Sequence, residues 1–475
     1  MSEAEIKNAK WRRRKNKQAQ DEHLPYLAPA LNARAMKPAL QEFFRREYPE
    51  RGLRVEAVDL GKVYHKPGKD CEITYGVRCR DNENKIYAMW FQAKMSASLK
   101  ERAAAPRTWP GCGFWKPVHV WPEMDMVLYT FPYDRKLPYL GQLLEPAWVK
   151  QQVEANVAGF GLSAGVKCQH VTVEKIKYMP GKRCVLRYEI LFDEQQRRIF
   201  YGKTYDDAQG RHVFQALQKI CASPACHDGR LNVPAPVAYL ETANTVWQQA
   251  WEGEDFNNMM QKTGWANFQQ TDFPPQIATM LAALHGIVIS EVALRRGHSP
   301  PAVLLNACDD ASDIAPFAPE RREMLTAFTR TLESAMTLFE SPAPETTIHG
   351  SFKLAQLLCR EHPDGRRQLA LIDFDSIASG DPLYDVAEFV ASVAFLQVSD
   401  EIPAAWLNES IEIFLTSYER QVPWVCERWR LAWYVTAFLL GKIHSALKRR
   451  EPNGVKNMAR AFALVEEWIN ILTRR

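Results

Sequence analysis

The sequence predicts an α+β protein in which two β-rich units precede a mainly helical half. A short pattern of alternating residues occurs twice in the first half, and apolar residues recur at helical spacing from about residue 253 onward. The 475 residues also exceed what one compact core usually holds, so we expect more than one domain. A hydrophobic share of 46% is sufficient for several buried cores.

The repeated pattern is that of a β-hairpin. Residues 58–75 read VDLGKVYHKPGKDCEITY and residues 171–188 read VTVEKIKYMPGKRCVLRY. In each copy a Pro-Gly-Lys turn joins two alternating stretches, as in a hairpin. A polar loop follows, and we expect a third strand from Ile86 in the first copy and from Ile199 in the second.

A further pair of strands follows in each copy. KPVHVWPEMDMVLYTF, from Lys116, is similar to APVAYLETANTVWQQA, from Ala235. Between the hairpin and this pair, the expected third strand of the second copy contains Lys203. In direct register Trp90 of the first copy corresponds to Lys203, whereas four inserted residues bring Lys94 to that position. Both alignments remain open.

The predicted organisation has four parts. They are a basic N-terminal segment with helical character (1–52), a first β-rich repeat (53–150), a second β-rich repeat (151–252) and a helical half (253–475). Toward the C-terminus the spacing of apolar residues predicts helices at about 384–397, 404–419, 426–449 and 455–473.

Composition narrows the classes of protein. The formal net charge of +4 is small for this length and indicates no particular partner. No apolar run reaches the roughly 18 residues that a membrane helix needs. Ten cysteines without paired CxxC spacing or a secretory signal predict a reducing, cytoplasmic location.

The N-terminal segment carries a cluster of cations around Trp11. This pattern is typical of a solvated tail, or of a segment that contacts an anionic surface such as lipid headgroups or nucleic acid. The cations are Lys7, Lys10, Arg12, Arg13, Arg14, Lys15 and Lys17.

The most informative stretch runs from His349 to Asp385 and reads HGSFKLAQLLCREHPDGRRQLALIDFDSIASGDPLYD. It resembles the catalytic core of the aminoglycoside phosphotransferase and choline kinase-like family, relatives of the protein kinases. That core reads HGD with an Asn five residues later, then IDF or IDW, then GDPxxD. The resemblance implies a bilobal protein kinase-like fold with a β-rich small lobe and a mainly helical large lobe. Here an extra small-lobe-like β domain would precede it.

Three positions depart from the family pattern. Ser351 stands where the family has its catalytic Asp, and Gln356 stands where it has Asn. A serine hydroxyl is not ionised near neutral pH and cannot accept a proton as a carboxylate does, whereas Gln keeps the carbonyl oxygen of Asn. No Glu occurs from 209 to 220, where kinases carry the helix Glu that orients the third-strand lysine.

The resemblance implies ATP and Mg²⁺ as cofactors and assigns roles to site residues. Asp373 and Gln356 would supply hard oxygen ligands to the metal, and Lys203 would reach the α- and β-phosphates. Lys353 matches the lysine of the HRDLK motif, which contacts the γ-phosphate in protein kinases; a solvated loop lysine is the alternative. Asp375, two residues after the metal ligand, is a candidate to approach the acceptor hydroxyl.

The Pro-Gly-Lys turn of the second copy would stand where kinases place the loop that covers the phosphates. Backbone amides at Gly181, with the charges of Lys182 and Arg183, could hold phosphate. A plain hairpin turn is an equal alternative.

Two functions remain open. The first is an ATP- and Mg²⁺-dependent phosphotransferase that acts on a hydroxyl group of an unidentified small molecule, with an atypical active site. The second is a pseudokinase, a nucleotide-binding or nucleotide-free scaffold whose duplicated lobe binds a protein partner. Asp373 and Lys203 favour the first, and Ser351 favours the second.

Overall fold

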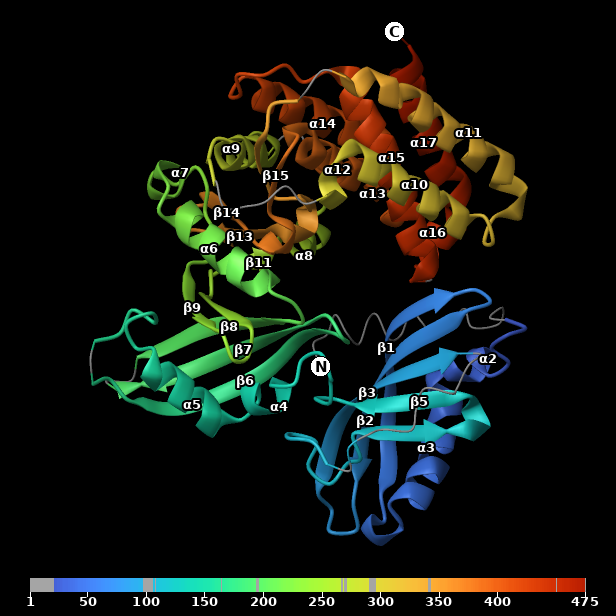
Figure 1. The fold of residues 1–475 in the computed structure, drawn as a ribbon, viewed down its shortest axis with the longest axis vertical. Coiled ribbons are helices and arrows are strands. Elements are labelled where there is room, and N and C mark those ends of the chain that lie inside the picture. The colour runs from blue at the N-terminus through green and yellow to red at the C-terminus, as the bar shows by residue number, and fades with distance from the viewer. Residues whose placement is uncertain are drawn as a thin grey trace. The chain divides into compact units, whose positions relative to one another are not determined.

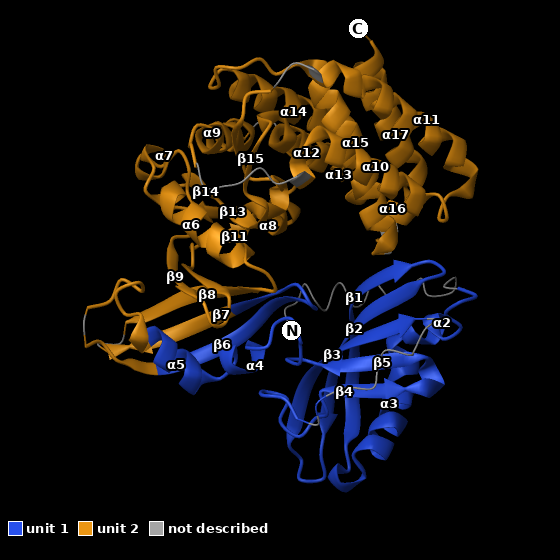
Figure 2. Ribbon diagram, in the orientation of Figure 1, with its two compact units in different colours: residues 1–153, 170–186 blue, residues 154–169, 187–475 orange. Residues whose placement is uncertain are grey.

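The computed structural model contains two compact units, shown in different colours in Figure 2. Unit 1 comprises Met1–Val153 and His170–Leu186, and unit 2 comprises Glu154–Gln169 and Arg187–Arg475. The structure describes residues 21–96, 106, 108–163, 165–193, 196–265, 268, 271–289, 296–340, 343–449 and 451–474. The predicted basic cluster around Trp11 lies outside the described residues.

Unit 1 begins with helices and a five-stranded antiparallel sheet of order β1-β2-β3-β5-β4 (Figure 1). Its third strand starts at Ile86, as the sequence predicts. The elements are α2 (Leu27–Ala30), α3 (Ala33–Glu47), β1 (Arg54–Lys66), β2 (Asp70–Arg80), β3 (Ile86–Ser96), β4 (Val118–Trp121) and β5 (Met126–Thr130).

Helix α3 is stabilised by a capping residue at its N-terminus and by the burial of one apolar face. The side chain of Asn32 caps the helix by accepting the backbone N–H groups of Arg34 and Ala35. The buried residues of α3 recur at helical spacing and pack on the sheet, with the Phe43 ring stacked on Trp121 at a centroid distance of 4.5 Å. They are Met36, Leu40, Phe43 and Phe44.

A second set of elements has the same strand order, β6-β7-β8-β10-β9. The division between the two units runs through this sheet, because β6 and the first half of β7 are grouped with unit 1. The elements are α4 (Leu140–Leu143), α5 (Pro146–Ala155), β6 (Cys168–Met179), β7 (Arg183–Phe192), β8 (Arg197–Tyr205), α6 (Gln209–Cys221), α7 (Pro224–His227), β9 (Pro236–Leu240) and β10 (Thr245–Gln249).

Strand pairing decides between the two alignments of the repeat. Lys203 in β8 pairs with Val246 in β10, and Lys94 in β3 pairs with Val127 in β5. Val127 and Val246 correspond, because the turns before them both place a residue at positive φ, Asp125 at 47° and Asn244 at 46°. Lys94, and not Trp90, therefore occupies the position of Lys203.

The rest of unit 2 is mainly helical, and its helices pack around α12 and α15, which are buried along most of their length. The helices are α8 (Phe256–Thr263), α9 (Phe273–His285), α10 (Pro300–Ile314), α11 (Arg322–Ala335), α12 (Pro382–Ala394), α13 (Leu396–Ser399), α14 (Ala404–Glu419), α15 (Arg428–Lys448), α16 (Pro452–Lys456) and α17 (Met458–Thr473). Short strands cross this half: β11 (Glu254–Asp255), β12 (Thr346–Ile348), β13 (Leu357–Glu361), β14 (Arg367–Leu371) and β15 (Ala378–Gly380).

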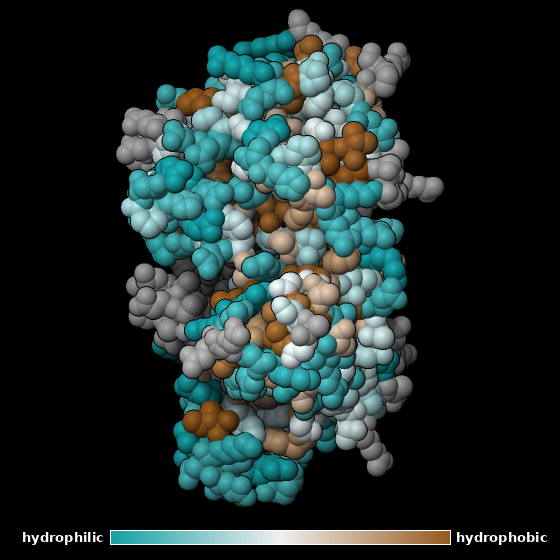
Figure 3. Space-filling view, turned by 90° about the vertical axis from the view of Figure 1, so that its left-hand side faces the viewer, coloured by the Kyte–Doolittle hydropathy of each residue, from teal (hydrophilic) through white to brown (hydrophobic). Residues whose placement is uncertain are grey.

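The helices, cysteines and surface of the structure have the properties that the composition predicts. In the part of the chain that the structure describes, no helix has the length and apolar character to cross a membrane. All ten cysteines are free thiols. On the face shown in Figure 3, hydrophobic side chains form small groups separated by hydrophilic ones, which is normal for a folded surface.

Candidate active site

A short hairpin delivers two of the predicted site residues to one place. Strands β13 and β14 pair from Leu357 opposite Leu371, and the N–H of Ile372 donates to the carbonyl of Gln356 at 2.9 Å. Asp373, the next residue, has a left-handed backbone with φ of 70°, which Asp tolerates better than most residues. The hairpin thus brings Gln356 and Asp373 together at its base.

Lys203 lies at the centre of the site. Its ammonium forms ion pairs with the carboxylates of Asp373 and Asp375, the second at 2.7 Å. The Tyr205 hydroxyl donates to the same Asp375 carboxylate at 2.8 Å. Strand β8 and the residues after β14, about 170 positions apart in sequence, therefore meet through one ammonium and two carboxylates.

Gly202 explains how β8 presents this lysine. A Cβ at Gly202 would lie 2.7 Å from Cε2 of Tyr188, because the Tyr188 ring covers this strand and stacks on Trp247. The absence of a side chain allows this close packing beside Lys203.

Kinases carry the orienting Glu partway along the helix that follows the third strand. Helix α6 contains no Glu, and its first residue is Gln209. The Gln209 side-chain amide donates to the backbone carbonyl of Asp375. Lys203 consequently receives its negative partners from Asp373 and Asp375 rather than from α6. The absence of a Glu in this helix was visible in the sequence, but the contact of Gln209 with Asp375 was not.

Asp385 fixes the loop that contains position 351. Its carboxylate is fully buried and accepts the backbone N–H groups of His349 at 2.6 Å and Gly350 at 2.8 Å. His285 also donates to it through Nε2 at 3.2 Å, and the Tyr418 hydroxyl lies 2.6 Å from His285 Nδ1. Asp385 therefore holds this loop in place through its two backbone contacts.

His349 is neutral and structural in this setting. Burial lowers the pKa of His349, although Asp385 opposes the shift. Its Nε2 donates to the carbonyl of Ile372 at 3.0 Å, which ties the loop to the strand before Asp373. Asp381, by contrast, caps α12 through the N–H of Leu383 and binds Arg430 at 2.8 Å.

At position 351 the hydroxyl has a cationic neighbour. The ammonium of Lys353 donates to Oγ of Ser351 at 3.0 Å and lies 3.8 Å from Oε1 of Glu388 on α12. Ser351, Lys353 and Glu388 therefore form one connected group. The sequence predicted the first two as site residues and missed Glu388.

The residues of this site lie within a segment that matches a known protein family. Residues 202–423, from the glycine beside Lys203 to a point within the loop after α14, match the family described as phosphotransferase enzyme family. These residues form a phosphotransferase domain of that family. The predicted α+β fold is confirmed by the helices and sheets of the structure, and this match confirms the suspected family. Among curated protein sequences, none matches the chain.

Solved structures similar to the chain are distant. A choline kinase from Streptococcus pneumoniae is 15% identical, with a TM-score of 0.41, over 67% of this chain and 98% of that one. The GDP complex of aminoglycoside 2'-phosphotransferase-IIIa is 15% identical, with a TM-score of 0.41, over 68% and 98%. A choline kinase from Cryptosporidium parvum is 12% identical, with a TM-score of 0.45, over 68% and 95%.

The predicted phosphate-binding turn precedes the matched phosphotransferase domain, and a carboxylate already occupies it. Asp134 accepts the N–H of Gly181 at 2.7 Å and the hydroxyl of Tyr178 at 2.9 Å. Lys182 is exposed, and Arg183 Nε lies 3.3 Å from the sulfur of Met179. For the Gly181 amide to hold phosphate, Asp134 would first have to leave it, so this role stays a prediction.

The first repeat contains the same arrangement. Asp21 accepts the N–H of Gly68 at 3.0 Å and lies 2.8 Å from Nε2 of His65. Although burial acts to raise the pKa of Asp21, its hydrogen bonds to Gly68 and His65 outweigh that effect and lower it. We call each pair of an Asp and its hairpin turn a clasp.

The clasps reveal a part of the repeat that the hairpin pattern alone did not show. Asp21 and Asp134 are separated by the same offset as Gly68 and Gly181, and Leu-Pro-Tyr-Leu follows three residues after each Asp. This tetrapeptide was the signal in the sequence that could have extended the repeat to its helices. Each copy therefore includes an Asp, a helical segment and five strands.

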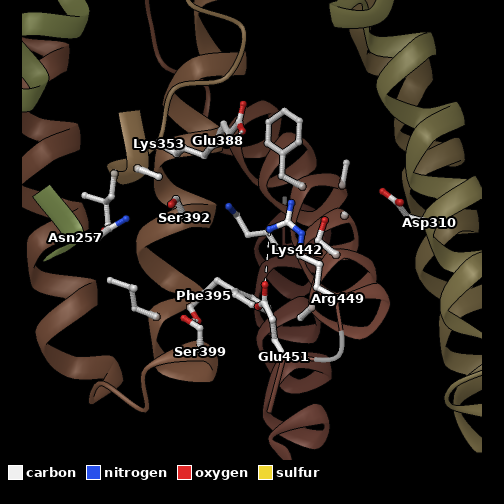
Figure 4. A pocket seen from close by; sticks show the side chains of 18 of the residues that line it. Asn257, Asp310, Lys353, Glu388, Ser392, Phe395, Ser399, Lys442, Arg449 and Glu451 are labelled. Carbon is white, nitrogen blue, oxygen red and sulfur yellow. Dashed lines mark hydrogen bonds and ion pairs between the residues drawn. The ribbon is translucent and has the colours of Figure 1, made fainter. Parts of the chain in front are cut away.

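A cavity of 670 Å³ lies in the helical part of the phosphotransferase domain. Its walls come from α8, α10, α12, α13 and α15 and from residues 353–355. Figure 4 shows Lys353 and Glu388 near one another at its edge, with Lys442 reaching toward it from α15. The volume lies within the range of small-molecule sites.

Lys442 makes this cavity sensitive to pH. Burial lowers the pKa of Lys442 to about 8, although Glu388 opposes the shift. Lys442 has no ion pair within the described part of the chain. The unfolded lysine, with a pKa of about 10.4, binds the proton more tightly than the folded one. Stability should therefore rise with pH between about 8 and 10.

We expect Lys442→Met to raise the free energy of unfolding at pH 7 by roughly 1–3 kcal/mol, after allowance for partial solvent screening. The gain should shrink as the pH rises toward about 10, because the wild-type ammonium then loses its proton. Denaturant unfolding at pH 7 and pH 9.5 measures both effects. Lys37→Met, at an exposed position of α3, is the control and should show no such pH-dependent gain.

Proposed function

We propose that the chain is an ATP- and Mg²⁺-dependent phosphotransferase that acts on a hydroxyl group of a small molecule through an atypical active site. The observation that carries this proposal is the meeting of Lys203 with Asp373 and Asp375. It joins a cation suited to phosphate oxygens with carboxylates suited to a metal, inside a domain of the phosphotransferase enzyme family.

The donor set fits a magnesium ion. Asp373 offers a carboxylate and Gln356 an amide oxygen at the base of one hairpin, and Mg²⁺ usually takes one or two carboxylates together with substrate phosphates and water. Among the described residues, no group of three or more His, Cys, Asp or Glu could hold a metal by itself. When bound, the metal would neutralise charge that develops on the transferring phosphoryl group.

The remaining residues bind and orient. Lys203, released from its carboxylates, would contact the α- and β-phosphates, and Lys353 would contact the γ-phosphate beside position 351. Because the transition state of phosphoryl transfer is loose, positioning and charge neutralisation contribute more than early proton transfer. Ser351 therefore slows the reaction without excluding it.

The second candidate is a pseudokinase scaffold. Ser351 and the absence of a Glu from residue 209 to residue 220 favour it. Under either candidate, residues 53–150 would form an extra small-lobe-like domain for partner binding or regulation. Residues 151–252 would form the small lobe and residues 253–475 the large lobe. Although the first repeat keeps Lys94 at the position of Lys203, it has no helical half of its own, which favours a structural or regulatory role.

We place the protein in the cytoplasm, because its ten thiols are unpaired, as expected in a reducing compartment. The partners would be a nucleotide and an acceptor that carries a hydroxyl group. Under the second candidate, a protein partner replaces the acceptor.

Thermal unfolding with ATP, with and without Mg²⁺, tests the proposal. We expect stabilisation by ATP that requires Mg²⁺, amounting to about 2.7 kcal/mol when the ligand exceeds its Kd about 100-fold. Absence of any shift with ATP and Mg²⁺ would contradict the phosphotransferase function. Binding without release of phosphate, measured over hours, would favour the scaffold.

A further inference from the structure

Position 351 lacks a carboxylate, but a carboxylate stands beside it. Lys353 links the two, with its ammonium 3.0 Å from Oγ of Ser351 and 3.8 Å from Oε1 of Glu388. Glu388 is only 15% exposed in its side chain, so its charge is held in a largely desolvated place. The carboxylate that the family pattern has at position 351, and that this chain lacks there, is thus present on a neighbouring helix.

The carboxylate of Glu388 also faces space for an acceptor. Lys353 and Glu388 both line the 670 Å³ cavity, together with small and polar residues such as Ala355 and Ser392 (Figure 4). A small molecule in this cavity would therefore lie against Glu388 and Lys353, and the Lys353 ammonium contacts the hydroxyl of Ser351.

Helix α12 holds Glu388 in a fixed relation to the loop. Asp385, three residues earlier on the same helix face, accepts the N–H groups of His349 and Gly350. Asp381 caps the same helix and binds Arg430. The helix that anchors the loop is therefore the one that carries the carboxylate, which favours a defined geometry over a chance surface contact.

We propose that Glu388 accepts the proton of the acceptor hydroxyl, in place of the aspartate that is absent at position 351. This rests on the proposed phosphotransferase function. In the step, the hydroxyl oxygen forms a bond to the γ-phosphorus and the bond from that phosphorus to the bridging oxygen of ADP breaks. The hydroxyl proton passes to the Glu388 carboxylate and from there to solvent.

The surroundings of Glu388 suit this role. Burial raises the pKa of Glu388, while Lys353 and Lys442 oppose the shift. A carboxyl group whose pKa is raised toward the working pH holds a proton more effectively. A carboxylate that only neutralised Lys353 would need no access to a cavity, whereas Glu388 has it.

The test uses the full chain and hydrolysis of MgATP with water as the acceptor. We expect Glu388→Gln to lower the rate by roughly 10²- to 10⁴-fold, with unchanged thermal stabilisation by MgATP. Ser351→Asp in the Glu388→Gln background should restore most of the lost rate, because it returns a carboxylate to the family position. Rescue by a second carboxylate is not expected if Glu388 only supports the fold.

Glu412→Gln, on the exposed side of α14, is the matched control and should keep the wild-type rate. A Glu388→Gln rate within twofold of wild type would overturn the proposal. So would hydrolysis that appears only after Ser351→Asp, or no hydrolysis by any variant although MgATP binds. Failure of the wild-type chain to bind MgATP would instead overturn the proposed function itself, and with it this role.

Discussion

Asp373→Asn should abolish the dependence of ATP binding on Mg²⁺. Asn keeps the shape of Asp and tolerates the left-handed backbone at this position, so the local fold should be retained. Lys203 would still have the Asp375 carboxylate at 2.7 Å. The metal, however, would lose its charged protein ligand, and phosphotransfer or hydrolysis should fall by roughly 10³-fold or more, as expected when charge neutralisation of the phosphoryl group is lost.

Thermal unfolding with ATP, with and without Mg²⁺, measures the first effect, and phosphate release measures the second. Asp272→Asn is the matched control, because Asp272 is exposed just before α9 and its side chain forms no cap bond. A variant at position 373 that kept the full Mg²⁺-dependent shift would show that the metal binds elsewhere.

Asp385→Ala should be among the most destabilising substitutions in the phosphotransferase domain. It would leave the N–H groups of His349 and Gly350, and the ring of His285, without their buried acceptor. Each buried donor without a partner costs about 1–3 kcal/mol. We therefore expect a loss of roughly 3 kcal/mol or more in the free energy of unfolding, measured by denaturant titration.

Asp385→Asn provides a graded test where the alanine variant fails to fold. Asn keeps one acceptor oxygen and should lose less stability than Ala. Glu467→Ala, on the exposed face of α17, should change stability by about 0.5 kcal/mol or less. Equal effects at positions 385 and 467 would show that Asp385 does not hold the loop.

The spacing of apolar residues predicted the bounds of α14 and α15 closely, because buried residues recur at helical spacing along both helices. The helix expected at 404–419 is α14, and that expected at 426–449 is α15, which spans Arg428–Lys448. The first turn of the helix expected at 455–473 is instead the end of the short α16, and α17 begins at Met458. Local spacing cannot show this break, which depends on how the segment packs.

Parts of the site could not be predicted from the sequence, because they depend on contacts between residues that lie far apart in the chain. The spacing of HGS, IDF and GDP located Asp373, but it could not show that Asp373 and Asp375 share Lys203 or that Gln209 binds the carbonyl of Asp375. Glu388 belongs to none of the sequence motifs. Only the structure shows that α12 places it next to Lys353. Strand register, likewise, was needed to choose Lys94 over Trp90.

The clasp of Asp134 has a practical consequence for where the chain can be cut. A shortened protein that begins at residue 151 would lack this aspartate and the Leu-Pro-Tyr-Leu segment, and the Gly181 amide and Tyr178 hydroxyl would lose their acceptor. A start at residue 132 keeps the carboxylate with its turn. The first copy carries its own aspartate at position 21. The duplicated segment therefore begins before its strands, and each copy contains its own clasp.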